Sequence, residues 1–187
     1  MKTGDTRNPG DPDPRTLVER TIRVDQAGEF GAVRIYEGQL AALRLTGRAG
    51  GEAGRKIAHM AAAEREHNRT FDRLLAERRV RPTVLSPLWH VAGFALGAAT
   101  ALMGEKAAMA CTVAVEETID EHYAQQAAAL GDDEAELRAT IEKFRAEEIE
   151  HRDTALAAGA EQAPAYGALT AAVRAGSRLA IWLSTRF

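Results

Sequence analysis

The sequence contains a single cysteine, Cys111, so it cannot form an internal disulfide. This cysteine lies in an apolar stretch, which favours a buried thiol in a reduced compartment. The 24 basic residues nearly balance the 27 acidic ones, and the net charge of −3 gives no indication of a nucleic-acid partner. Runs of β-branched residues are scarce and alanine is abundant, which favours an all-α chain. With 187 residues, 45% of them hydrophobic, the chain suits one domain with a sizeable core.

The first 14 residues also lack an apolar run. They contain three prolines, which predicts a disordered tail over 1–14, and they resemble neither a secretory signal nor a transit peptide. Proline and glycine positions divide the remaining residues, 15–187, into six helices. The predicted helices span about 14–46, 55–80, 88–103, 105–130, 132–159 and 164 to nearly the C-terminus.

One pattern is present twice: a lone glutamate on one helix, then a glutamate three residues ahead of a histidine on the next long helix. The lone glutamate precedes its partner by 64 − 29 = 35 residues in the first copy and by 148 − 116 = 32 in the second. The two halves therefore resemble related helical hairpins. The six residues are Glu29, Glu64, His67, Glu116, Glu148 and His151.

Helix periodicity places these six residues on buried faces. Apolar residues recur at alternating steps of three and four on a core-facing helix, and each glutamate and histidine of the pattern continues such a stripe. The series Ile57, Met60, Glu64, His67, Phe71 is one example. A stripe shifted to Glu117 is poorer than the one through Glu116. Three neighbouring acids fall off their stripes, and we expect them on solvated faces: Glu66, Glu147 and Glu150.

Four glutamates in one core require compensation, because an uncompensated buried carboxylate costs several kcal/mol or changes its protonation. Two divalent cations would supply the opposite charge, and carboxylates with imidazole suit iron or manganese. Chance placement of surface glutamates is the alternative for one copy of the pattern, but two copies favour metal. The sequence thus predicts an all-α, ferritin-like four-helix bundle with two additional amphipathic or apolar helices, one di-iron domain over 15–187.

Residues 82–104 contain no charged side chain. The run is long enough to suggest a membrane span. A crossing there would, however, place Glu64 and His67 across the bilayer from the other predicted ligands. We therefore expect this helix (82–104) and the basic C-terminal helix (164–187) to contact a membrane surface. The alternative is that the two helices pack on each other or form the interface of a homo-oligomer.

The predicted helix that contains Glu116 also carries two candidates for supporting a ligand by a hydrogen bond. Tyr123 continues the buried stripe and His122 is its neighbour. Core packing is the alternative for Tyr123, and simple exposure the alternative for His122. His59 is expected at the surface, and His90 at an interface.

Four stretches are similar to the demethoxyubiquinone hydroxylase family of ubiquinone biosynthesis: RVDQAGEFGAVRIYEGQ, RVRPTVLSPLWHVAGFALGAATALMGEKAAMACTVAVEETI, FRAEEIEHRD and APAY. The resemblance covers about residues 18–187. It implies a di-iron monooxygenase that uses dioxygen to hydroxylate the ring of a demethoxylated polyprenyl quinol. It also implies that Glu29 and Glu116 are terminal ligands, that Glu64 and Glu148 bridge two iron ions, and that His67 and His151 each bind one.

The resemblance further implies electrons from NADH or through the quinone, and a possible lipid-binding accessory protein. We expect a peripheral protein on the cytoplasmic face of a bacterial inner membrane or, alternatively, on the matrix face of the mitochondrial one. The quinol ring would enter beneath helix 82–104, near Phe94 and Leu96, while its tail stays in the membrane. Two rival functions remain open at this point, an iron-storage or ferroxidase bundle and a metal-free membrane scaffold.

Overall fold

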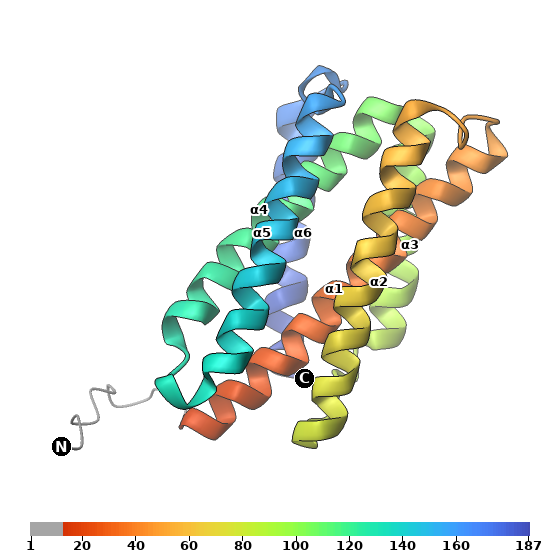
Figure 1. Cartoon of the computed structure of the whole chain (residues 1–187). Coiled ribbons are helices and arrows are strands. Elements are labelled where there is room, and N and C mark those ends of the chain that lie inside the picture. Colours follow the sequence, from red (N-terminus) through yellow and green to blue (C-terminus); the bar gives the residue numbers. More distant parts are fainter. Residues whose placement is uncertain (1–12) are drawn as a thin grey trace.

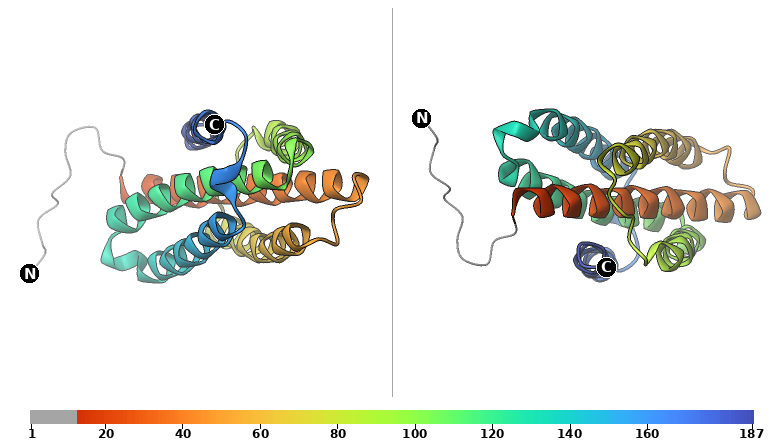
Figure 2. Two further views of the ribbon diagram at one scale, coloured as in Figure 1. Left: turned by 90° about the horizontal axis from the view of Figure 1, so that it is seen from above. Right: turned by 90° about the horizontal axis from the view of Figure 1, so that it is seen from below.

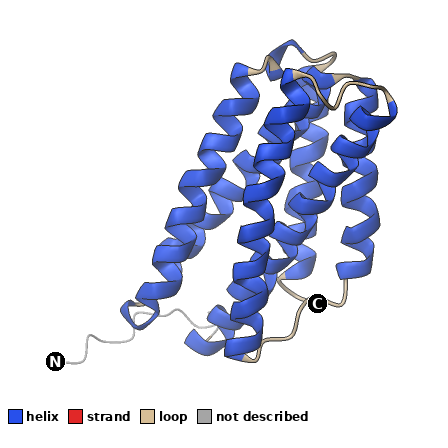
Figure 3. Cartoon of the chain, turned by 45° about the vertical axis from the view of Figure 1, so that its right-hand side comes forward, coloured by secondary structure: helices blue, strands red, loops and turns tan. Residues whose placement is uncertain are grey.

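The computed structural model describes residues 13–187, and this part consists of helices and loops without a strand (Figures 1 and 3). Residues 1–12 of the predicted tail lie outside the described residues. Its last two positions were wrongly assigned to a tail, because they begin the first helix. Asp13 is the N-cap, its Oδ1 accepting the backbone N–H of Thr16 at 3.1 Å, and Pro14 is the first helical residue.

All six predicted helices are present. Their bounds are α1 Pro14–Leu45, α2 Glu52–Arg78, α3 Ser86–Met103, α4 Glu105–Ala129, α5 Ala135–Ala157 and α6 Tyr166–Ser184, with 3₁₀ turns at Asp132–Glu134 and Ala160–Gln162. Four predicted helix starts were displaced, including that of α3, which begins at Ser86 instead of residue 88. Helix α2 begins before Gly54, α5 begins after the 3₁₀ turn that contains Asp132, and α6 begins two residues after Pro164. Gly54 lies within the helix, where its bare Cα lets the backbone of Ala49 approach closely.

The helices form three layers, which are clearest when the molecule is viewed along the bundle (Figure 2). Helices α1 and α4 lie in the middle, with α2 and α5 on one side and α3 and α6 on the other. A middle helix must be buried on two faces, and all residues from 107 to 116 of α4 are buried accordingly. The predicted four-helix bundle (α1, α2, α4, α5) with two additional helices is therefore confirmed.

Helix α3 packs closely on α1 through glycines. A side chain at Gly97 would collide with the backbone of Ile35, and one at Gly38 would collide with the backbone of Phe94. Because no side chain separates the two backbones at these points, the crossing tolerates no larger residue. Phe94 lies under the guanidinium of Arg34, 5.0 Å from its ring centroid, so it is held against α1.

Helix α6 is attached to α4 by ion pairs. Arg174 donates to Glu117 at 2.8 Å, and Arg178 donates to Glu121 at 2.9 Å. Two of the arginines that the sequence assigned to a basic, lipid-facing helix thus lie in ion pairs with acids of the same chain, and contact of α6 with a membrane stays a prediction. Glu117, which gave the poorer stripe, is half-buried in one of these ion pairs.

The outer layer carries exposed apolar side chains. They are Val84, Leu88, Val91, Leu102 and Met103 around α3, and Leu179, Trp182 and Phe187 around α6. The indole of Trp89 is partly buried between the two helices and donates to Ser184 Oγ at 2.9 Å. Within residues 13–187 no helix is both long and apolar enough to cross a membrane.

Candidate metal centre

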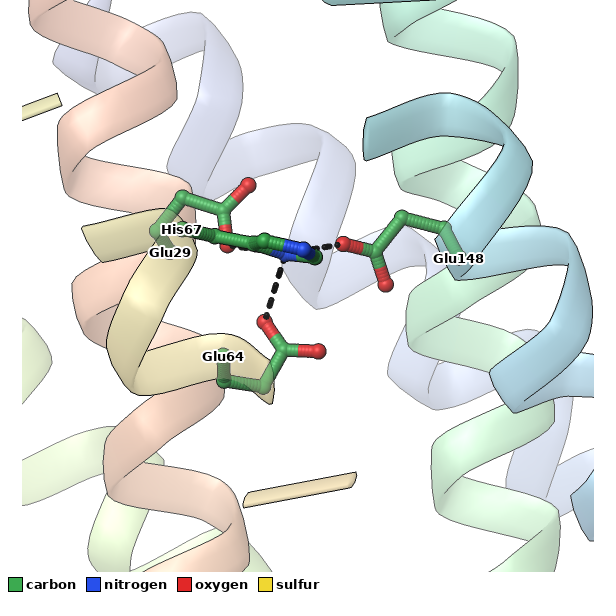
Figure 4. A group of neighbouring side chains, drawn as sticks. All are labelled: Glu29, Glu64, His67 and Glu148. Atoms are coloured by element: carbon green, nitrogen blue, oxygen red, sulfur yellow. Dashed lines mark hydrogen bonds and ion pairs between the residues drawn. The ribbon is translucent and has the colours of Figure 1, made fainter. Parts of the chain in front are cut away.

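The bundle brings all six predicted residues together in its interior. They form two groups whose potential ligand atoms lie within 4.8 Å of one another: Glu29, Glu64, His67 and Glu148, and Glu64, Glu116, Glu148 and His151. Glu64 and Glu148 belong to both groups. Figure 4 shows the first group, with side chains from α1, α2 and α5 pointing toward one another. All six side chains are buried.

Each histidine turns the same ring nitrogen toward the acids. Nδ1 of His67 lies 3.0 Å from Glu148 Oε1 and 3.5 Å from Glu29 Oε2. Nδ1 of His151 lies 3.0 Å from Glu64 Oε1 and 3.2 Å from Glu148 Oε2. One nitrogen and several carboxylate oxygens therefore converge at each of two adjacent positions, with the two shared acids between them.

Several of these buried oxygens accept no hydrogen bond from the residues that the structure describes. They are Glu29 Oε2, Glu116 Oε2 and both side-chain oxygens of Glu64. An ionised carboxylate buried without such partners is strongly destabilising. Cations bound between the acids would satisfy these oxygens, and a donor set made only of carboxylate oxygen and imidazole nitrogen suits iron or manganese. The side chains present thus fit a pair of metal ions.

The pKa shifts of the metal-free cluster follow from burial and from the crowding of negative charge. Burial raises the pKa of Glu64 and of Glu116 well above the usual range, and repulsion from Glu148 adds to the shift. Burial also raises the pKa of Glu29, even though His67 opposes that shift. Glu148 behaves differently: burial would raise its pKa, but hydrogen bonds from the two histidines outweigh burial and lower it to about 2. Without metal, the cluster therefore retains protons that cations would displace.

Two tyrosines link the hairpins to each other. Tyr36 of α1 donates to Glu116 Oε1 of α4 at 2.6 Å, and Tyr123 of α4 donates to Glu29 Oε1 of α1. The role considered for Tyr123, support of a ligand candidate, agrees with this contact. Sequence reasoning missed the same role for Tyr36, although the equal spacing of seven residues from Glu29 to Tyr36 and from Glu116 to Tyr123 was a usable signal.

Among the remaining candidates, Glu66, Glu150 and His59 are exposed as expected, and Cys111 is buried. The expectation for Glu147 was wrong: it lies off the buried stripe and is about one-third exposed, yet its Oε2 lies 2.6 Å from Nε2 of His67. The stripe describes one helix at a time, whereas Glu147 reaches from α5 to α2.

His122 is mostly covered and belongs to a polar cluster beside the metal site. Its Nε2 lies 2.8 Å from Nε2 of Gln126 and 3.5 Å from Oδ1 of Asp25, and Gln126 also donates to Asp25 at 2.7 Å. Simple exposure is therefore wrong for His122, and so is a direct hydrogen bond to one of the six residues. The partner of His90 is also within the chain, since its ring stacks on Phe30 with centroids 6.1 Å apart.

A cavity of about 400 Å³ lies on the other side of the middle layer, between α1, α3, α4 and α6. Its walls are almost wholly apolar, and Leu96 and Trp89 of α3 face Leu179 and Ile181 of α6. Gly28 and Val115 also line the cavity, and each directly precedes one of the buried acids, Glu29 and Glu116. Each middle helix thus presents an acid to one face and cavity wall to the other.

Comparison with known proteins identifies the family. The family model described as ubiquinone biosynthesis protein COQ7 matches residues 16–184. The chain belongs to the COQ7 family. This match spans nearly all of the described residues, so it includes both hairpins, the cavity and the two outer helices.

Curated relatives of this COQ7-family chain are named as hydroxylases. The 3-demethoxyubiquinol 3-hydroxylase of Rhodospirillum rubrum is 61% identical over 185 residues, covering 99% of this chain and 85% of that protein. The human NADPH-dependent 3-demethoxyubiquinone 3-hydroxylase, a mitochondrial protein, is 51% identical over 176 residues, with 92% and 79% coverage. The mitochondrial 5-demethoxyubiquinone hydroxylase of Saccharomyces cerevisiae is 39% identical over 191 residues, with 91% and 78% coverage. The resemblance stated from the sequence is confirmed.

Proposed function

We propose that this COQ7-family chain is a monooxygenase that hydroxylates the ring of a demethoxylated polyprenyl quinol with a di-iron centre. One observation carries this proposal: two four-residue groups share Glu64 and Glu148, and an apolar cavity lies one helix away from them. The relatives' names supply the class of substrate and the reaction. Rival functions in storage or as a scaffold would leave the cavity without a purpose.

In this proposal Glu29 and His67 would hold one iron ion, Glu116 and His151 would hold the other, and Glu64 and Glu148, which belong to both groups, would contribute to both positions. The iron pair, when bound, supplies reduction and cleavage of dioxygen. The protein's own contribution is positional. Tyr36 and Tyr123 each hold one oxygen of a terminal glutamate, which leaves the other oxygen directed at the metal position.

The cavity is proposed to hold the substrate. A quinone ring with part of a prenyl tail is apolar enough to replace water along walls built from alanine, leucine and isoleucine. Gly28 and Gly31 leave open space where a side chain would project, so these two positions of α1 widen the cavity that the helix lines. The ring would lie toward the acids, and the tail would leave between α3 and α6.

The exposed apolar side chains of α3 and α6 are proposed to rest on the lipid from which the substrate comes. Phe94 and Leu96, the residues expected to mark the entry route, are partly buried, so Leu88 and Val91 are better probes of docking. A peripheral position on the cytoplasmic face of a bacterial inner membrane is proposed, with the mitochondrial matrix face as the alternative. The accessory protein and the homo-oligomer stay predictions.

Labelled dioxygen tests the reaction. Iron-loaded protein would be mixed with a demethoxylated quinol in vesicles, with either NADH or NADPH as the reductant, under ¹⁸O₂. We expect one ¹⁸O atom in the ring of the product, detected by mass spectrometry, and two iron ions per chain. Both nicotinamides are needed because several relatives are named NADPH-dependent, whereas the family resemblance implied either NADH or the quinone as the source of electrons.

The matched control is His151→Ala, which removes one proposed iron ligand and keeps the cavity. Loss of one iron ion per chain together with loss of the label would support the assignment. A product labelled from H₂¹⁸O instead of ¹⁸O₂, or full activity of the iron-free protein, would refute it.

A further inference from the structure

His67 is contacted on three sides. Its Nδ1 faces the buried acids, as Figure 4 shows, with Glu148 Oε1 at 3.0 Å. Its ring lies on that of Phe144, with centroids 4.0 Å apart and an angle of 27° between the planes. Its Nε2 lies 2.6 Å from Oε2 of Glu147. Phe144, Glu147 and Glu148 all belong to α5, so a single helix fixes this side chain of α2.

Glu147 itself is held at both of its oxygens. While Oε2 faces His67, Oε1 lies 3.7 Å from Nζ of Lys143, one turn earlier on α5. The Lys143 side chain is about two-thirds exposed, so this ion pair orients Glu147 and contributes little to stability. The carboxylate is thus directed at the histidine, although it belongs to neither group of potential ligands.

The other Glu-x-x-His pair, Glu148 and His151, has no equivalent of this contact. Aligning Glu64 and His67 with Glu148 and His151 places Ala63 at the position of Glu147. Alanine has no side-chain acceptor. Within residues 13–187, the only carboxylates within 4.0 Å of the His151 ring nitrogens are those of Glu64 and Glu148. Both of them lie beside Nδ1, not Nε2. The outer surroundings of the two histidines are therefore unequal.

We infer that Glu147 is a positioning residue for one metal ion only: it accepts the Nε2–H of His67 and so keeps Nδ1 free to bind metal. This inference rests on the proposed function, since it needs His67 to be a ligand. A carboxylate that accepts from the second nitrogen of a metal-binding histidine fixes the tautomer and the ring orientation and raises the basicity of the ligand. The position formed by Glu29 and His67 therefore binds its metal more tightly than the position formed by Glu116 and His151.

Metal titration with a set of matched variants tests the inference. Fe²⁺ or Mn²⁺ would be added under anaerobic conditions to the full-length wild type, Glu147→Gln, Glu147→Ala and Glu150→Gln, and binding followed by calorimetry. The wild type should bind two ions in two steps. Because loss of such a partner typically costs 10–100-fold in affinity, Glu147→Ala should weaken the tighter step by at least about tenfold and leave the weaker step unchanged.

Glu147→Gln should have a smaller effect than Glu147→Ala, since a neutral amide oxygen still accepts the N–H. Glu150 is exposed on the same helix, so Glu150→Gln controls for the loss of one charge. A second readout is the exchangeable Nε2–H resonance of His67 in the proton NMR spectrum of Co²⁺-loaded protein. Exchange with solvent should be faster in Glu147→Ala, and a merely structural role would leave it unchanged.

The outcomes separate this inference from the proposed function. If the wild type binds two ions and Glu147→Ala binds both with unchanged affinity, the positioning role is refuted while the metal centre stands. Equal weakening of both steps would also refute it, because the effect would not be confined to His67. If the wild type binds no metal, the proposed function and this inference are both refuted.

Discussion

The molecule consists of two three-helix halves, α1–α3 and α4–α6, that agree closely at the centre and differ at the outside. At the centre, each half supplies a lone glutamate, a Glu-x-x-His pair and a tyrosine that donates to the other half's glutamate. At the outside, α3 packs on α1 through glycines, whereas α6 is attached to α4 by exposed or half-exposed ion pairs. The two halves thus match in their six ligand candidates and two tyrosines and differ in how the outer helix is attached.

The difference indicates which outer helix can move. Ion pairs at a surface contribute at most about 1 kcal/mol each, whereas a backbone crossing without intervening side chains gives way only when the packing is lost. Although α6 also buries Val173 in the core, we expect it to be the more readily displaced wall of the cavity, and α3 the more rigid one. Five predictions test how far the two halves are equivalent, beginning with the largest effect.

The largest effect should come from replacing a glutamate that belongs to both ligand groups, compared with one that belongs to a single group. Glu148→Ala removes a residue of both groups and should reduce metal content toward zero and activity by more than about a hundredfold, since even outer partners are worth 10–100-fold. Glu116→Ala should retain the metal ion of the other half. Metal analysis after dialysis distinguishes the two variants, and equal loss in both would end the distinction between bridging and terminal acids.

Filling the cavity from α1 should reduce turnover without harming the fold. Gly31 lines the cavity and has open space at its Cβ position, so Gly31→Leu places a side chain where the substrate is proposed to lie. Activity on a long-tailed quinol should fall at least tenfold, an effect of about 1.4 kcal/mol or more. Metal content and Tm should be unchanged, because leucine also favours a helix over glycine. Wild-type turnover would place the substrate elsewhere.

The two outer crossings should respond differently to mutation. Gly97→Leu forces a side chain against the backbone of Ile35 and should lower the free energy of unfolding by about 3 kcal/mol. Arg178→Gln removes an exposed ion pair and should change the free energy of unfolding by less than about 1 kcal/mol. Denaturant titration measures both values, and a large effect of Arg178→Gln would contradict the assignment of α6 as the weaker attachment.

The metal-free protein should become less stable as pH rises from about 5 to 8. The raised pKa values of Glu29, Glu64 and Glu116 mean that the folded chain binds more protons than the unfolded chain in this range, so unfolding becomes easier as pH increases. His67 acts in the same direction above pH 6.5, because hydrogen bonds from Glu148 and Glu29 outweigh burial and raise its pKa to about 11. The lowered pKa of Glu148 matters only at more acidic pH.

Thermal unfolding at several pH values measures this trend, and a saturating divalent metal provides the control. Since cations replace the protons, the slope with pH should be flatter or reversed in the metal-loaded protein. A metal-free Tm that rises between pH 5 and 8 would show that the acids are already ionised and compensated in another way.

The two tyrosines should give small and nearly equal effects. Tyr36→Phe and Tyr123→Phe each remove one buried hydrogen bond to a terminal glutamate, and each should lower the free energy of unfolding by about 1–2 kcal/mol. Calorimetric unfolding compares them. A difference of several kcal/mol between the two variants would show that the two tyrosine hydrogen bonds contribute unequally to stability, although their arrangement is similar.

Much of the centre could be predicted from the sequence, because its six residues continue helical stripes and the pattern is repeated. Steps of three and four place Glu64 and His67 on one helical face whatever surrounds them. The features that could not be predicted all depend on how the helices are placed relative to one another. The cavity needs four helices at once, and Glu147 lies off its own stripe but against His67 of another helix. Pairing of Arg174 with Glu117 likewise depends on the position of α6.

The adjacency of Gly28 to Glu29, and of Val115 to Glu116, has a consequence for how this scaffold can change. A one-residue insertion in either middle helix would rotate the residues beyond it by about 100°, turning ligand and cavity wall together. The candidate metal ligands and the cavity wall therefore cannot be shifted independently along α1 and α4. Under the proposed function, a change in the preferred tail length would have to come from the cavity-lining helices that bear no ligand candidate, α3 and α6.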